Sequence, residues 1–410
     1  MSNKQNITIN RLDTLCSDII DCSHSTPVWR DRGIRVIRNF NLNEGSLDFS
    51  KGAFVDEKTY LERTKRAVPE AEDIVISREA PMGTVAIIPH NLKCCLGQRL
   101  VLLKVNSDIC SSSYLLFALM SGFVQNQFNK IGSTVSNLTI PELKETKIPL
   151  VKNHKAIGKL LESIANKIQV NKQINDNLAA MIKTIYEYWF IQFEFPDENG
   201  KPYKSSGGKM VWNEQLKREI PDSWRTEKLL NIVSWESNSQ PPKSEFIYSP
   251  KDGYVRFIQN RDYENDSYKT YIPLTNNLST VNRFDILIDK YGDAGVVRYG
   301  IEGAFNVALG KINVLYPNCQ EYVRSFLESD GIYSYLHNSC MASTRASLNE
   351  SNLDMLNIVI PDENSLLRYQ EDIHQIRETI LLNNSENQNL ISLRDWLLPM
   401  LMNGQATIED

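Results

Sequence analysis

Two stretches of the chain, one in each half, combine arginine, glutamine and asparagine with aromatic residues. The first runs from Trp29 to Asn39 and the second from Tyr254 to Arg261. Their side chains carry the paired donors and acceptors that can read guanine and adenine edges in the major groove of DNA. An ordinary solvated strand face would look the same, and phosphate contacts are commoner than base contacts for such arginines. The candidate residues are Arg30, Arg32, Arg35, Arg38, Arg256, Gln259 and Asn260.

Further candidates lie at the ends of short β-like runs and in the loops that follow them. Arg78 and Lys290 each end such a run and lead into a glycine-containing loop. Hydroxyls and backbone amides in two later loops could bind phosphates, although turn capping explains the same residue types. These loop residues are Ser133, Thr134, Ser343, Thr344 and Arg345.

No group of residues in the sequence has the spacing of a known catalytic or metal site. Gly207–Met210 lacks the first glycine and the Ser or Thr of a phosphate-binding loop. Gln240–Lys243 lacks the amide and the aromatic with which amino-methyltransferases hold a flipped base. The five histidines are scattered, so neither a zinc cluster nor a nucleophile–histidine pair is predicted. The sequence therefore predicts a non-catalytic chain.

The candidate residues recur because the chain repeats itself. Asp73–Arg78 is echoed by Asp285–Lys290 at an offset of 212, and Arg35–Asn39 by Arg256–Asn260 at an offset of 221. Each repeat opens with short β-like runs punctuated by glycine and proline and closes with a long helical pattern. These features predict a tandem duplication of an α+β unit of about 200 residues.

The two closing helices carry the clearest periodicity in the sequence. Apolar residues alternate spacings of four and three from Ile157 to Trp189 and from Tyr369 to Leu401. A seam sustained over more than four heptads predicts a coiled coil, and a helix of such length would extend about 55 Å. Both seams are interrupted by two asparagines that would fix the register of the pair. These register residues are Asn171 and Asn175 in the first helix and Asn383 and Asn387 in the second.

The matched asparagines favour two helices that pack on each other and act as a spacer. The helices must run antiparallel if the two similar units are to lie at opposite ends of the pair. The alternative is two unrelated amphipathic helices that each pack on their own domain. The Pro-, Gly- and Ser-containing segment Phe195–Lys209 between the repeats predicts a linker.

Composition excludes several classes of protein. The chain has 410 residues, of which 41% are hydrophobic, and a net charge of −5. These values are ordinary for a soluble protein of two to four domains, and the charge does not exclude DNA binding, which depends on where charges lie. Apolar stretches are too short for a membrane span, Met1–Asn10 is unlike a signal peptide, and the seven cysteines show no disulfide framework. A cytoplasmic location without membrane association is expected.

Three segments carry a family resemblance. Leu393–Gln405 resembles the C-terminus of Type I restriction–modification specificity subunits. Ile185–Pro196 is similar to these subunits, as is the linker from Gly207-Gly208 to Ile220–Trp224. The duplicated order of variable unit, helix, variable unit, helix is also this family's layout.

The resemblance implies an α+β fold with two globular α/β target recognition domains in tandem, separated by two long helices packed as an antiparallel coiled coil. The implied boundaries are residues 1–150 for the first recognition domain, 151–195 for the first long helix, 196–220 for the linker, 221–361 for the second recognition domain, and 362–410 for the second long helix and C-terminal tail.

The function that the resemblance implies is sequence-specific binding of double-stranded DNA, without catalysis by this chain. Each recognition domain would read one half of a split, asymmetric site, and the helix pair would dock two methyltransferase subunits. A restriction translocase–nuclease subunit would complete the assembly. No cofactor is expected in this chain, whereas S-adenosylmethionine, ATP and Mg²⁺ are expected on the partner subunits.

Three other functions remain open at the level of sequence. A specificity subunit of a Type IIB-like system would have the same layout and a different partner. A coiled-coil scaffold that binds proteins would show little salt-dependent affinity for DNA. A stand-alone DNA methyltransferase would have to bind S-adenosylmethionine without a partner.

Overall fold

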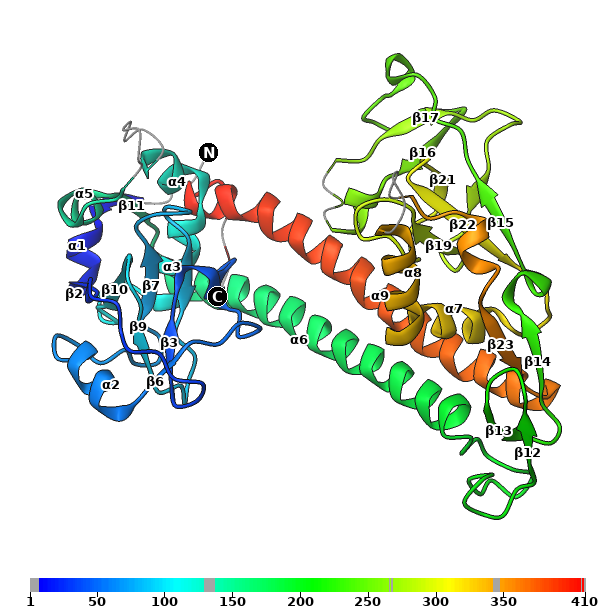
Figure 1. Ribbon diagram of the computed structural model, residues 1–410. Helices are drawn as coiled ribbons and strands as arrows, with labels where there is room; N and C mark the ends of the chain where they lie inside the picture. Colours follow the sequence, from blue (N-terminus) through cyan, green and yellow to red (C-terminus); the bar gives the residue numbers. More distant parts are fainter. Residues whose placement is uncertain are drawn as a thin grey trace. The chain divides into compact units, whose positions relative to one another are not determined.

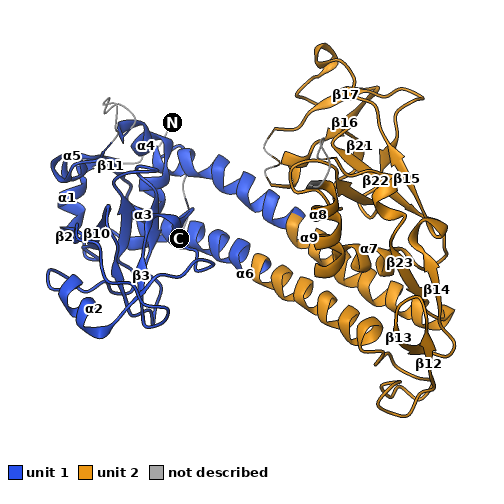
Figure 2. Ribbon diagram, in the orientation of Figure 1, with its two compact units in different colours: residues 1–171, 385–410 blue, residues 172–384 orange. Residues whose placement is uncertain are grey.

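The computed structural model describes residues 7–128, 137–264, 266, 268–341, 347–406 and 408. Its elements form the predicted mixed α+β fold, with two β-rich regions and two long helices in contact (Figure 1). The chain divides into two compact units, residues 1–171 with 385–410 (unit 1) and residues 172–384 (unit 2), coloured separately in Figure 2. Each unit therefore contains one β-rich region together with part of both long helices.

Unit 1 is built on a four-stranded antiparallel sheet and a smaller three-stranded sheet. The four-stranded sheet has the order β2 (Cys16–Asp21), β10 (Leu100–Val105), β7 (Ile74–Ser77) and β8 (Val85–Ile87). The three-stranded sheet has the order β6 (Phe54–Val55), β3 (Ile34–Ile37) and β9 (Cys94–Leu96), with β3 and β9 parallel. Two further pairs are β1 (Thr8–Arg11) with β11 (Lys147–Leu150) and β4 (Leu42–Asn43) with β5 (Ser46–Leu47). Strand β7 is a short apolar run buried at every position, as expected for a strand covered on both faces.

Helices cover the sheets of unit 1. They are α1 (Leu12–Leu15), α2 (Glu57–Arg63), α3 (Ser112–Met120), α4 (Gly122–Phe128) and α5 (Ile140–Glu145). The hydroxyl of Ser111 accepts a hydrogen bond from the N–H of Tyr114 and so caps α3. Six consecutive buried residues of α3, 114–119, join Ile74 and Ile76 of β7 in the main core of this unit.

Unit 2 repeats the same plan. Its four-stranded sheet has the order β15 (Val233–Ser237), β22 (Leu309–Val314), β19 (Ile286–Asp289) and β20 (Val297–Arg298). Its second sheet has the order β17 (Tyr271–Pro273), β16 (Tyr254–Ile258), β21 (Gly303–Phe305) and β18 (Thr280–Val281), with β16 and β21 parallel. The remaining strands are β14 (Arg225–Lys228) with β23 (Asn357–Ile360) and β12 (Met210–Asn213) with β13 (Arg218–Pro221), and the short helices are α7 (Gln320–Glu328) and α8 (Asp330–Met341).

Matched backbone hydrogen bonds confirm the predicted duplication. In unit 1 the N–H of Arg78 donates to the carbonyl of Arg99 at 2.9 Å, and in unit 2 the N–H of Lys290 donates to the carbonyl of Ala308 at 2.8 Å. The N–H of Leu138 donates to Arg78, as the N–H of Leu348 does to Lys290, each at 3.0 Å. The two halves of the chain are therefore two copies of one scaffold.

The long helices are α6 (His154–Tyr186), which continues into a π-helical turn at Glu187–Ile191, and α9 (Glu363–Met402). In unit 1 the start of α6 packs on the end of α9, because Ile157 and Leu161 share a core with Leu398 and Leu401. In unit 2 the end of α6 packs on the start of α9, where Ile182 and Trp189 share a core with Tyr369 and Ile373. The helices therefore run antiparallel, as predicted. None of the described helices is long and apolar enough to cross a membrane.

The segment predicted as a linker is largely folded. The bounds of residues 196–220 include most of the hairpin β12–β13, and Phe195 stacks on Tyr203 and on Trp224 with ring centroids 4.6 Å apart in both cases. A Cβ at Gly208 would lie 2.4 Å from the Tyr203 ring, which explains a glycine at that position. Glycine here permits close packing rather than flexibility.

Candidate nucleic-acid interface

The predicted DNA contacts of unit 1 gather around the three-stranded sheet. The N–H of Arg30 donates to the carbonyl of Phe54 at 2.9 Å, beside β6, and its guanidinium forms an ion pair with Asp56 at 2.8 Å. Hydrogen bonds from Thr59 and Arg30 hold the pKa of the Asp56 carboxyl well below its usual range. The exposed Arg32 forms no ion pair with any described residue. Both arginines are exposed.

Aromatic rings hold the next two arginines. The guanidinium of Arg35, on β3, lies 4.6 Å from the ring centroid of Phe49 and 5.1 Å from that of Phe54. The guanidinium of Arg38, just after β3, lies 5.1 Å from Trp29 and 4.9 Å from Phe40. Cation–π contacts orient a guanidinium without consuming its N–H donors. Both side chains are therefore oriented before any ligand arrives.

Arg78 and Arg256 have different surroundings from these four arginines, because each forms an ion pair and is largely buried. The Arg78 side chain is 13% exposed, forms an ion pair with Asp21 at 3.1 Å and donates from Nε to the carbonyl of Leu138 at 2.9 Å. Arg256, on β16, is 18% exposed and forms an ion pair with Asp266. Both guanidinium groups hold their own unit together.

The other predicted residues of unit 2 are half-buried. Gln259 donates from Nε2 to the hydroxyl of Thr270 at 3.2 Å. The side chain of Asn260 hydrogen-bonds to the carboxyl of Asp289, whose pKa is raised because burial penalises its charged form. Lys290 directly follows β19, the strand equivalent to β7, and its carbonyl accepts a hydrogen bond from the N–H of Leu348. The predicted loop residues Ser133, Thr134, Ser343, Thr344 and Arg345 lie outside the described residues.

Arg38 and Gln259 occupy equivalent positions in the two units. Each follows a strand that pairs in parallel with another, β3 with β9 and β16 with β21. The N–H of Arg38 donates to the side chain of Asn41 at 3.0 Å, and the N–H of Gln259 donates to the side chain of Asp262 at 2.9 Å. The scaffold is the same, and the side chain that it presents differs.

The four predicted register asparagines face one another across the two long helices. Asn171 donates to Asn387 at 2.9 Å, and Asn383 donates to Asn175 at 2.8 Å. Asn171 also donates at 2.7 Å to Glu386, a residue that the sequence did not single out. The pairing matches an antiparallel register in which the first asparagine of each helix meets the second asparagine of the other helix.

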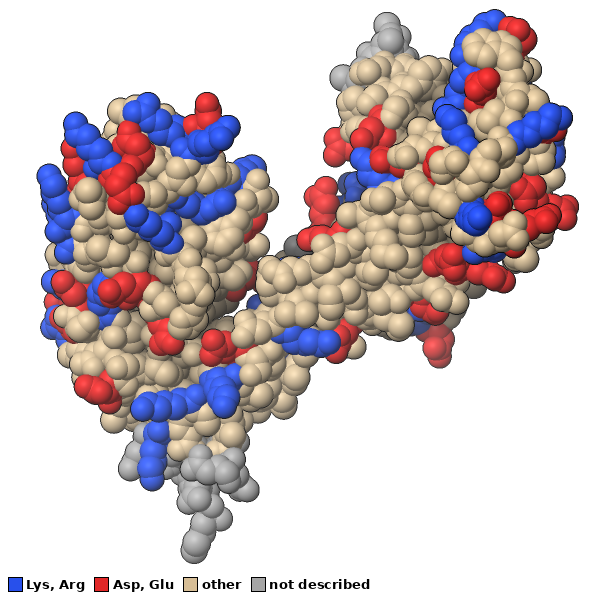
Figure 3. Space-filling model, turned by 90° about the horizontal axis from the view of Figure 1, so that it is seen from below, with Lys and Arg blue, Asp and Glu red and all other residues tan. Residues whose placement is uncertain are grey.

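Charge alone does not mark an interface on the face seen in Figure 3. Lysine and arginine are interspersed with aspartate and glutamate over both units in that view. The candidate interface must therefore be judged from particular side chains rather than from a single-sign surface.

Comparisons with known proteins agree with the predicted family. The model of a family described as Type I restriction modification DNA specificity domain matches residues 33–180. The chain is 26% identical over 380 residues to the Type I restriction enzyme MjaIX specificity subunit of Methanocaldococcus jannaschii, which covers 87% of this chain and 82% of that protein. It is 21% identical over 412 residues to the HindI specificity subunit of Haemophilus influenzae, with coverage of 84% and 88%.

A solved structure extends this agreement to the fold. The S subunit of a Type I restriction–modification system from M. genitalium aligns with 97% of this chain and 96% of its own, at a TM-score of 0.61 and 16% identity. The chain belongs to the Type I restriction–modification specificity subunits. It is thus the DNA specificity subunit of such a system and a non-catalytic one, as predicted.

Sequence reasoning missed part of the specificity subunit's candidate interface. A pocket of about 500 Å³ beside Arg38 is lined by Pro27, Trp29, Arg38, Asn39, Phe40, Ala80, Pro81, Gln98 and Arg99. Gln98 and Arg99 carry the donors expected of a base- or phosphate-contacting residue. The repeat gave no signal for them, because their counterparts in unit 2, inferred from the matched hydrogen bonds, are Val307 and Ala308.

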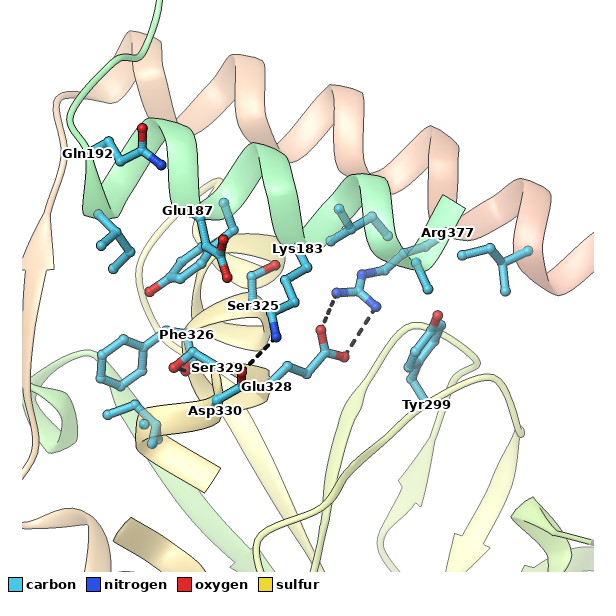
Figure 4. Close-up of a pocket in the computed structure, with 17 residues that line it drawn as sticks. Lys183, Glu187, Gln192, Tyr299, Ser325, Phe326, Glu328, Ser329, Asp330 and Arg377 are labelled. Carbon is cyan, nitrogen blue, oxygen red and sulfur yellow. Dashed lines mark hydrogen bonds and ion pairs between the residues drawn. The ribbon is translucent and has the colours of Figure 1, made fainter. Parts of the chain in front are cut away.

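A cluster of ion pairs that the sequence did not reveal connects α9 of the specificity subunit to the globular part of unit 2. Arg377 of α9 pairs with Glu328 at 2.7 Å and with Glu321 at 2.8 Å, both on α7. The guanidinium groups of Arg377 and Arg324 each lie 4.9 Å from the ring of Tyr299. These contacts border a cavity of about 720 Å³ between the end of α6 and the helices α7, α8 and α9 (Figure 4).

Proposed function

We propose that this specificity subunit recognises a split, asymmetric site in double-stranded DNA. The recognition domains are residues 1–150 and 221–361, and each contacts one half of the site. The observation that carries the proposal is the duplicated scaffold with different side chains at equivalent positions, Arg38 in one copy and Gln259 in the other. Two copies of one scaffold can bind two stretches of duplex, and their different side chains require the two half-sites to differ.

The surroundings of the candidate residues separate those proposed to contact DNA from those proposed to support the surface. Arg32, Arg35 and Arg38 form no ion pair with a described residue, so we propose that they contact DNA directly. We propose that Arg30 also contacts DNA, with a phosphate replacing Asp56 as its ion-pair partner. The exposed ion pair with Asp56 contributes little to stability, so breaking it costs little. In unit 2 the proposed contacts are Gln259 and Lys290, together with the hydroxyl- and arginine-bearing loops predicted in both repeats. The side chain of Asn260 bonds to Asp289 and would support this surface. Arg78 and Arg256 support these surfaces from within.

The long helices are the proposed docking surface for two methyltransferase subunits. In unit 2, Ile174, Met181 and Tyr188 recur every seven residues on one side of α6 and the turn that extends it, and each is at least 40% exposed. An apolar row that the other long helix does not cover is typical of a protein interface. The methyltransferase subunits would supply S-adenosylmethionine and the active site. A restriction translocase–nuclease subunit would supply ATP- and Mg²⁺-dependent chemistry, and the assembly would work in the cytoplasm.

Methylation mapping tests this proposal. Genomes of a strain that carries this gene with its methyltransferase gene, and of a strain that lacks only this gene, are compared for methylated motifs. The proposal predicts a bipartite motif with two different halves and a fixed gap, present only with this chain. If the methyltransferase is expressed and folded and no such motif appears, the proposed function fails.

A binding measurement separates the DNA reader from a protein-binding scaffold. A reader that makes several phosphate contacts loses orders of magnitude in affinity as salt rises from about 50 to 200 mM. We therefore expect the complex of this chain with its methyltransferase subunits to show that loss on duplex DNA. An affinity that does not change with salt would favour the scaffold.

A further inference from the structure

Arg38 lies in a surface pocket of unit 1 where two exposed aromatic rings hold its guanidinium. The ring of Trp29 is 5.1 Å away and that of Phe40 is 4.9 Å away, and these residues are 41% and 43% exposed. The pocket has a volume of about 500 Å³ and also contains Gln98 and Arg99. Large aromatic side chains that remain this exposed around an arginine indicate a surface shaped for a ligand.

The charge of Arg38 is not neutralised by any described carboxylate. Arg30 and Arg99, its neighbours on the same face, pair with Asp56 at 2.8 Å and with Glu79 at 3.1 Å. Arg38 forms no ion pair among the described residues, so its fork of N–H donors remains available. A planar guanidinium fits a ligand with two acceptors side by side, which DNA offers at a phosphate or at the O6 and N7 atoms of guanine.

The second copy of the scaffold shows which side chains around this pocket are structural. Asn39 and Asn260 are equivalent and identical, and both bind the scaffold: Asn39 donates to the carbonyl of Glu79 at 2.6 Å, and Asn260 bonds to Asp289. The residues on either side of this asparagine differ. Arg38 corresponds to Gln259 in unit 2, and Phe40 corresponds to Arg261.

The far wall of the pocket changes in the same way. The carbonyl of Arg99 accepts the Arg78 N–H as that of Ala308 accepts the Lys290 N–H, so Arg99 corresponds to Ala308, and Gln98 to Val307. The polar wall of unit 1 is therefore apolar in unit 2. Different exposed side chains at equivalent backbone positions are expected where the two copies recognise different ligands, rather than where both hold the same phosphate.

We infer that Arg38 is a specificity-determining residue that recognises a guanine in the major groove of the half-site bound by unit 1. Its guanidinium donates to O6 and N7 while Trp29 and Phe40 hold its plane. The inference rests on the proposed function and names the base that this site takes. At the equivalent position, the amide of Gln259 suits adenine, and the neighbouring Val307 suits the methyl group of the paired thymine.

The test compares methylation motifs of the wild-type complex with those of complexes that carry Arg38→Gln, Arg38→Lys and Arg38→Ala. We expect one G·C pair of the wild-type motif to change to A·T or to become degenerate with Arg38→Gln, and to become degenerate with Arg38→Ala. Arg38→Lys keeps the charge and loses the planar fork, so it should weaken the preference for that pair. Arg32→Ala, a neighbouring exposed arginine, should lower methylation at all sites without changing the motif.

A binding measurement keeps the test decisive if a variant folds poorly. Replacing the guanine by 7-deazaguanine removes N7 and leaves the phosphates untouched. The wild-type complex should lose roughly 5- to 150-fold in affinity, and the Arg38→Ala complex should lose nothing further from the same replacement.

Three results would overturn the inference: a wild-type motif without guanine in either half, a motif unchanged by Arg38→Gln and Arg38→Ala, or a uniform loss of methylation that indicates a phosphate contact. The absence of any motif from the wild-type complex is a separate result, because it would refute the proposed function itself.

Discussion

At the scale of single residues, burial decides what each arginine of this chain does. Arg377 is 3% exposed and lies between two glutamates, Arg78 is 13% exposed and pairs with Asp21, whereas Arg38 is exposed and held only by aromatic rings. A buried guanidinium is stable only with its partners in place, so it serves the fold. An exposed and unpaired guanidinium remains free to bind a ligand.

Removing the buried arginine should unfold unit 2 at much lower denaturant concentration. Arg377→Ala leaves the fully buried Glu321 and the partly buried Glu328 without this partner. Loss of one member of a buried ion pair typically costs about 3–5 kcal/mol. The measurement is the urea midpoint of the full chain, followed by tryptophan fluorescence.

The control for this variant is an exposed ion pair made by the neighbouring residue of α9. Arg283 pairs at 3.1 Å with Glu378, the residue after Arg377, and both side chains are more than 40% exposed. Arg283→Ala should change the free energy of unfolding by less than about 1 kcal/mol. Equal shifts of the urea midpoint for the two variants would contradict the assigned role of burial.

Residue types and spacing suggested candidate DNA contacts, but they could not show which of these side chains are paired within the fold. Arg78 and Arg38 look alike in the sequence, and only the fold places Asp21, 57 positions away, against Arg78. Gln98 and Arg99 could not be predicted as neighbours of Arg38 either, because the pocket beside Arg38 is assembled from four separate segments of chain.

At the scale of elements, the two long helices were the most predictable part of the molecule. A heptad pattern is local, so the sequence revealed both helices, and the matched asparagines revealed their antiparallel pairing. The hairpin β12–β13 was predicted as part of a linker, because glycine and proline suit a tight turn and a flexible segment equally well. The stacking of Phe195 on Trp224 shows that this segment is folded rather than flexible.

The paired asparagines should show coupled effects on stability. Asn171→Leu leaves the buried Asn387 oxygen without its donor, which costs about 1–3 kcal/mol. Adding Asn387→Leu replaces both amides with apolar groups and should recover most of that loss. A double-mutant cycle of urea midpoints measures the coupling. Additive effects of the two substitutions would show that the asparagines do not act as a pair.

The contact between Asn171 and Glu386 predicts a pH dependence. Hydrogen bonds from Asn171 and from Lys167 lower the pKa of the Glu386 carboxyl. A carboxyl with a lowered pKa contributes stability above its unfolded pKa and loses that contribution as pH falls through its folded pKa. The difference in thermal midpoint between wild type and Glu386→Gln should therefore be present at about pH 7 and shrink towards about pH 3. A difference independent of pH would contradict this assignment.

At the scale of the whole molecule, the duplication would let one chain recognise the proposed asymmetric site. Strand orders, parallel pairs and backbone hydrogen bonds correspond between the two units, while the exposed positions beside them differ. The repeated scaffold was predictable because apolar runs and glycines recur at nearly constant offsets. The recognised bases were not, because they depend on exposed side chains that carry no periodic signal.

Shortening both long helices by one heptad should shorten the gap of the recognised motif. Asn171 faces Asn387 and Asn175 faces Asn383, so deleting residues 168–174 together with 384–390 keeps facing positions in phase and retains the second pair. Seven residues of helix correspond to about 10 Å, or about three base pairs. Methylation mapping reads the gap directly, and an unchanged gap would show that the helices do not set it.

The most direct test of the account exchanges one recognition domain and leaves the other in place. Residues 1–150 are replaced by the first recognition domain of a relative whose methylation motif is known, and the motif of the chimera is mapped. We expect one half of the motif to change to that of the relative, while the other half and the gap are retained. A change in both halves, or in neither, would contradict the claim that each domain reads its own half-site.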